Sequence, residues 1–149
     1  MNRKILIIIM MTGFVSLSSL TGNCQTTVSG YGNSSAPHIG AWKLVSYKYS
    51  ATGNFVSVPK GDKHIKLITE THFMWAQSDT ATMKVSEMAG GEYTLKGNTY
   101  TESIDYGIGM NNYLGRRQVF TLLVEGDQLF LSGMLSDGYH VEEVWKRIK

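Results

Sequence analysis

The chain has 149 residues, enough for one domain, and its hydrophobic fraction of 42% is sufficient for a core. Lys and Arg number 14 against 12 Asp and Glu, and without Arg3 and Lys4 at the N-terminus the chain has 12 of each. The remaining chain is neutral and lacks the basic surface of nucleic-acid-binding proteins, so no nucleic-acid partner is expected.

The first 24 residues have the pattern of a signal peptide. Arg3 and Lys4 form a positive start, residues 5–15 are apolar, and residues 16–22 are small and polar. The apolar run is too short to span a bilayer, and no later segment approaches that length. We therefore expect residues 1–24 to be a signal peptide that exports the protein to the periplasm or the extracellular space.

The single cysteine, Cys24, lies at the end of this segment and leaves two processing routes open. Lipidation of Cys24 would give an outer-membrane lipoprotein, and this would be the protein's only hold on a membrane. Cleavage after Cys24 would release a soluble protein, and the small residues Gly22 and Cys24 suit that cut. Leu20 stands one place too early for a lipidation motif, which favours simple secretion. Residues 25–38, rich in Ser, Thr, Gly and Asn, are expected to be a flexible linker.

Residues 39–149 show short alternating segments separated by turns, which indicates an all-β domain. Strands are predicted at 42–49, 63–69, 71–77, 92–95, 99–106, 117–124, 128–135 and 139–148. Residues 80–88 fit either a short helix or an edge strand, ended by Gly90-Gly91, and residues 107–115 form a loop. About eight antiparallel strands in sequence order predict a single up-and-down β-barrel, because closure removes exposed edges. A β-sandwich is the alternative architecture.

The start of this domain, Gly40-Ala41-Trp42-Lys43-Leu44-Val45, resembles the opening signature of lipocalins. Five further stretches (63–66, 71–75, 90–95, 98–102 and 142–147) are similar to a family of small secreted bacterial lipocalin-like proteins of unassigned function, with a calycin-type barrel. The resemblance implies a lipocalin-like barrel over 39–149. It also implies that Trp42 is buried near one end of the barrel with Arg147 close to it.

Alternation places two carboxylates on apolar faces of predicted strands. Glu102 shares a face with Tyr100, Ile104 and Tyr106, and Glu143 shares one with Trp145. An inward carboxylate is costly unless it is paired, hydrogen-bonded or protonated. Arg116 or Arg117 is a candidate partner, and only one of these neighbours can point inward on a regular strand.

These residues predict an interior site for a small hydrophobic or amphiphilic molecule. The predicted ligand-binding residues are Tyr100, Glu102, Tyr106, Arg116, Arg117, Glu143, Trp145 and, with an ambiguous face, His72. A carboxylate head would be held by the arginine, and an amine or hydroxyl by Glu102 or Glu143.

Two other functions remain open. A packed structural or interaction module would use Glu102 and Glu143 in structural hydrogen bonds. A carboxylate-dependent enzyme is less favoured, because the chain lacks a Gly-x-Ser-x-Gly elbow, a Cys-His pair and a phosphate-binding loop. No catalytic residue is predicted. The four histidines show no metal-ligand spacing, so neither a metal nor a cofactor is expected.

Overall fold

A computed structural model describes residues 36–149, which form ten strands and no helix. The predicted signal peptide (1–24) and the linker as far as residue 35 lie outside the described residues. No helix within 36–149 has the length and hydrophobicity needed to cross a bilayer. In chain order the strands are β1 (Gly40–Lys48), β2 (Val56–Ser57), β3 (Asp62–Ile68), β4 (His72–Asp79), β5 (Val85–Lys96), β6 (Thr99–Ser103), β7 (Tyr106–Ile108), β8 (Arg117–Glu125), β9 (Gln128–Met134) and β10 (His140–Arg147).

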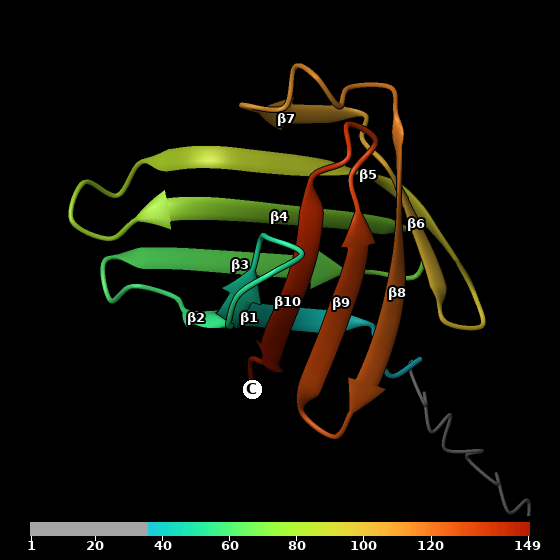
Figure 1. Cartoon of the computed structure of the whole chain (residues 1–149), viewed down its shortest axis with the longest axis horizontal. Coiled ribbons are helices and arrows are strands. Elements are labelled where there is room, and N and C mark those ends of the chain that lie inside the picture. The colour runs from blue at the N-terminus through green and yellow to red at the C-terminus, as the bar shows by residue number, and fades with distance from the viewer. Residues whose placement is uncertain (1–35) are drawn as a thin grey trace, which may run out of the picture. The chain divides into compact units, whose positions relative to one another are not determined.

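Eight of these strands close into an antiparallel barrel. The hydrogen-bonded order is β1-β3-β4-β5-β6-β8-β9-β10, and β10 pairs again with β1. The two short strands lie off this circuit, with β2 on β1 and β7 on β5. Figure 1 shows β8, β9 and β10 crossing in front of β3 and β4 at a steep angle. The predicted all-β, up-and-down barrel is confirmed.

The Gly90-Gly91 pair lies inside β5, and the prediction that it ends a segment is wrong. A Cβ at Gly90 would overlap the Tyr106 ring, and one at Gly91 would overlap the carbonyl oxygen of Ser103. The two glycines therefore let residues 103–106 approach β5 closely, at the point where β5 changes its partner from β7 to β6. For the same reason the predicted strand 99–106 is divided between β6 and the start of β7.

One end of the barrel is closed by Trp42, which has no exposed surface. The guanidinium carbon of Arg147 lies 4.1 Å from the centroid of the Trp42 ring. Arg147 also donates hydrogen bonds to the carbonyl oxygens of Ile39 and Pro37. The predicted position of Arg147 beside a buried Trp42 is confirmed.

His38 belongs to this closed end, although the sequence pattern assigned it to the linker. The side chain is buried, with Nε2 2.9 Å from the Tyr93 hydroxyl. The His38 carbonyl accepts a hydrogen bond from Trp42 Nε1. The packed core therefore begins before residue 39.

Candidate functional site

The barrel interior holds a cavity of about 430 Å³ in the half away from Trp42. The exposed residues Glu87, Asn112 and Tyr139 line it where the strands end, so the cavity opens at this end. Alternate residues of β3, β4, β6 and β10 face inward and form its wall. Its aromatic lining consists of Tyr49, Trp75, Tyr113, Phe120, Tyr139 and Trp145.

A buried ion pair forms part of the cavity floor. Lys66 Nζ lies 2.7 Å from Glu102 Oε1, and the two side chains are 2% and 3% exposed. The ammonium group also lies 5.6–5.7 Å from the ring centroids of Phe73, Tyr100 and Trp145. Burial of two charges is tolerated here because they neutralise each other and the rings contribute cation–π attraction.

Two polar atoms have no hydrogen-bond partner within residues 36–149: Tyr100 Oη, and Glu102 Oε1, the oxygen that pairs with Lys66. The contact of Glu102 with Lys66 is one of opposite charges at short range, and its angles do not meet those of a hydrogen bond. Buried polar atoms normally find a partner. Both atoms are buried, so neither is open to solvent from the cavity.

Glu143 is the second carboxylate of the cavity and is held by two neutral donors. Tyr49 Oη donates to Oε1 and Trp145 Nε1 donates to Oε2, each over 2.9 Å. Protein surrounds Glu143, and the part of its side chain that remains accessible faces the cavity. Burial raises the pKa of Glu143, and the positive charge of Lys66 opposes this shift. Burial and the neighbouring Glu143 raise the pKa of Tyr49, which therefore remains a donor at neutral pH.

His64 adds a titratable group between the floor and the mouth. Burial lowers the pKa of His64, although the carboxylates of Asp62 and Glu87 act in the opposite direction. The imidazole is therefore neutral at pH 7 and offers one donor and one acceptor.

The segment between β7 and β8 covers part of the mouth. Met110 is buried in the core, and Tyr113 lines the cavity. Tyr113 Oη donates a hydrogen bond of 2.6 Å to Asp137 in the turn between β9 and β10. This bond raises the pKa of Tyr113 to about 12. It ties the segment to the turn that follows β9, the strand paired with β8.

Of the residues predicted for the site, Glu102, Glu143 and Trp145 line the cavity. Tyr100 lies beneath the cavity floor, fully buried and in contact with Lys66. The remaining four lie outside the cavity and are exposed: Tyr106, Arg116, Arg117 and His72. The cation that pairs with Glu102 is thus Lys66, and the predicted arginine partner is wrong. Ligand binding by these residues stays a prediction.

Sequence reasoning missed Lys66, Tyr49 and Trp75 as cavity residues. The signal for Lys66 was the alternation of His64, Lys66 and Ile68 along β3, with a buried Ile68 fixing the inward face. Lysine is so rarely buried that this face was not taken as inward.

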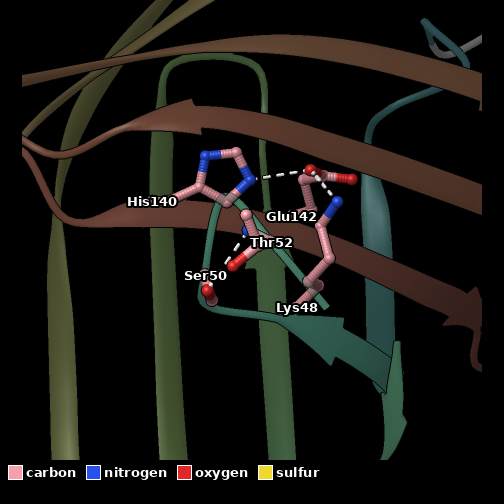
Figure 2. A network of polar contacts seen from close by, with 5 residues as sticks. All are labelled: Lys48, Ser50, Thr52, His140 and Glu142. Carbon is pink, nitrogen blue, oxygen red and sulfur yellow. Dashed lines mark hydrogen bonds and ion pairs between the residues drawn. The ribbon is translucent and has the colours of Figure 1, made fainter. Parts of the chain in front are cut away.

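A separate polar network lies on the outer face of the barrel where β1 pairs with β10. Lys48 Nζ and His140 Nε2 approach the same oxygen, Oε1 of Glu142, at 2.6 and 2.7 Å (Figure 2). Glu142 and Glu143 are consecutive residues of β10, so they point to opposite faces of the sheet. One carboxylate pairs with Lys48 and His140 on the outer face, and the other faces the cavity. Within residues 36–149 no group of three or more His, Cys, Asp or Glu could hold a metal ion.

No protein-family model matches this chain. No curated protein sequence matches it either. Among solved structures, the chain is similar to a de novo designed fluorescence-activating β-barrel. The identity is 15% and the TM-score 0.44, over 75% of this chain and 94% of the designed one. The architecture described above rests on the strand pairing of the protein itself.

Proposed function

We propose that the protein binds a small hydrophobic or amphiphilic molecule inside its barrel. The observation that carries this proposal is the cavity of about 430 Å³, open at one end, with aromatic walls and a few polar groups on its floor. Ligand sites of this size are mostly apolar, with a small number of polar groups that orient the ligand.

The distribution of packing within the barrel also favours binding over a purely structural role. Around Trp42, Leu44 and Leu129 the interior is filled by fully buried side chains. The other half is open and exposes charged groups to the cavity. A packed module would gain stability by filling both halves with apolar side chains, because open space forfeits packing contacts.

We further propose that the protein acts outside the cytoplasm, on the basis of the signal-peptide pattern in residues 1–24. Replacement of Cys24 by Ser in the native host, followed by cell fractionation, tests the two processing routes. A lipoprotein would move from the membrane to the soluble fraction. If the wild-type protein is already soluble, the lipidation route is contradicted.

Binding is tested by titration with the neutral fluorophore N-phenyl-1-naphthylamine. Leu135→Trp places a large ring in the cavity near its mouth, where Leu135 is half-buried. We expect wild type to bind about one fluorophore per chain and Leu135→Trp to lose this binding. Leu123→Trp, at an exposed position of β8, is the matched control. Equal binding by all three proteins would place the fluorophore outside the barrel and contradict the proposal.

A further inference from the structure

The charges around the cavity determine which head group a ligand can carry. Three carboxylates line the cavity (Glu87, Glu102 and Glu143) together with a single side chain of permanent positive charge, Lys66. Lys66 is already neutralised by Glu102 at 2.7 Å, and neither Arg116 nor Arg117 reaches the cavity. The cavity therefore holds more carboxyl groups than cationic side chains.

Two carboxylates of this set, Glu87 and Glu143, are accessible and form no salt bridge in the described part of the chain; Glu87 is exposed at the mouth, and Glu143 lies inside, beside the aromatic wall. Within residues 36–149 the charge of Glu143 has no ion-pair partner, because both groups that hydrogen-bond to it, Tyr49 and Trp145, are neutral. A carboxylate offers about four acceptor positions, so about two remain free. Glu102, in contrast, is almost completely buried beside Lys66.

The walls around Glu143 suit a positively charged ligand with an apolar body. Tyr49 and Trp145 hold the carboxylate, and Trp75, Phe120 and Tyr139 provide further aromatic surface in the same cavity. Aromatic faces attract cations and also bury apolar groups. A neutral polar head would gain less from this arrangement, and an anionic head would be repelled.

We infer that the cavity binds a small organic cation, a primary or secondary amine on an aromatic or aliphatic body, and that its ammonium group pairs with Glu143. This inference rests on the proposed interior binding function and specifies its ligand class. The ammonium donates to the free acceptor positions of Glu143, and the apolar body lies against the aromatic wall. Lys66 and Glu102 remain paired beneath the ligand.

Three probes of nearly equal shape test the inference on the full chain by isothermal titration calorimetry at pH 7.5. Phenethylamine carries an ammonium group, propylbenzene replaces it by a methyl group, and 3-phenylpropanoate replaces it by a carboxylate. We expect phenethylamine to bind at least about tenfold more tightly than propylbenzene, and 3-phenylpropanoate to bind most weakly.

Glu143→Gln should abolish the preference for phenethylamine and leave the affinity for propylbenzene unchanged. Glu142→Gln is the matched control, because it removes one negative charge from the adjacent residue on the outer face. It should change neither affinity. Thermal unfolding of both variants verifies that each remains folded under the titration conditions.

The outcomes separate the ligand class from the binding function. Equal affinity for phenethylamine and propylbenzene would overturn the inference and leave the proposed function standing. Tightest binding of 3-phenylpropanoate would also overturn it, with Lys66 as the head-group partner. If the preference survives in Glu143→Gln, the role of Glu143 is overturned. Failure of all three probes and of N-phenyl-1-naphthylamine would contradict the binding function as well.

Discussion

Lys66 on β3 and Glu102 on β6 meet inside the barrel with their charged atoms 2.7 Å apart, although the two strands do not pair with each other. Their contact crosses the interior and links opposite walls. Such a pair is needed once either charge is present, because a lone buried charge is strongly unfavourable. The two residues should therefore behave as one unit in stability measurements.

Removal of one member of this pair is expected to destabilise the protein more than removal of both. Glu102→Leu or Lys66→Met alone should lower the free energy of unfolding by about 3–5 kcal/mol. The double variant Lys66→Met/Glu102→Leu should recover most of that loss, because no unpaired charge remains. Urea unfolding of the three variants and wild type measures the coupling. Additive losses in the double variant would show that the ion pair is not a unit.

Arg147→Ala should lower the free energy of unfolding by about 2–3 kcal/mol. The loss combines a cation–π contact of about 1 kcal/mol with Trp42 and two hydrogen bonds of about 1 kcal/mol each. Lys146→Ala is the control, because Lys146 is the exposed neighbour on the same strand. Chemical denaturation that gives equal midpoints for both variants would contradict this role of Arg147.

The position of the first essential residue can be tested by truncation. A chain that starts at Ala36 should unfold as cooperatively as the full-length chain, because it keeps the contacts of Pro37 and His38. A chain that starts at Ile39 should be less stable, since it loses the carbonyl that Trp42 Nε1 uses and the buried imidazole. Thermal unfolding distinguishes them. Equal stability would show that His38 is dispensable for packing.

Stability should fall as the pH drops below about 6.5, in part because of His38. Burial lowers the pKa of His38 in the folded protein, so between that pKa and the ordinary value the unfolded chain binds more protons. The stabilising contribution is complete above pH 6.5 and is lost below it. The lowered pKa of His64 also makes the protein less stable at lower pH. The raised pKa of Glu143 has the opposite effect on stability.

His38→Gln isolates this contribution, because His64 and Glu143 are present in both proteins. Urea unfolding at pH 7.5 and pH 5.5 should show a smaller loss of stability in His38→Gln than in wild type. His72→Gln, at an exposed site, should lose as much stability as wild type. An equal pH dependence in all three proteins would exclude His38 as a source of the effect.

Tyr113→Phe should increase the rate of ligand release severalfold while leaving thermal stability nearly unchanged. The substitution removes the hydrogen bond to Asp137 that ties the segment before β8 to the neighbouring turn after β9, and keeps the aromatic ring. Stopped-flow displacement of bound N-phenyl-1-naphthylamine measures the rate. Asp137→Asn weakens the same bond from the other side and should act in the same direction. Unchanged release from both variants would show that this segment does not control access.

The inward placement of Glu102, Glu143 and Trp145 could be predicted because β6 and β10 alternate regularly through these residues. The positions of Tyr106 and Arg117 could not. Tyr106 lies beyond the break between β6 and β7, which the close approach to Gly90 causes. Arg117 is adjacent to Gln118, whose side chain is buried and accepts a hydrogen bond from the Ser136 amide, so Arg117 points outward.

Lys66 escapes sequence-based prediction for a different reason. Its burial depends on Glu102, a residue on a strand that does not pair with β3, and on three aromatic rings from β4, β6 and β10. The alternation along β3 allows Lys66 to face inward, but it does not contain the partners that make its burial tolerable. The strand order could be predicted because short turns join neighbouring strands. Contacts across the interior, such as Lys66 with Glu102, form only when the barrel closes, so the sequence pattern does not predict them.

The pairing of β10 with β1 also has a consequence for the time course of folding. The bond from Arg147 to the Ile39 carbonyl joins residues 108 positions apart, and the remaining strands lie between them in the chain. Loop-closure entropy disfavours so distant a contact until the intervening hairpins have formed. Closure of this seam is therefore expected to be the late step of folding, and its opening the first step of unfolding. The persistence of the native barrel over time would then depend on the contacts along one seam, part of which borders the cavity at Glu143 and Trp145.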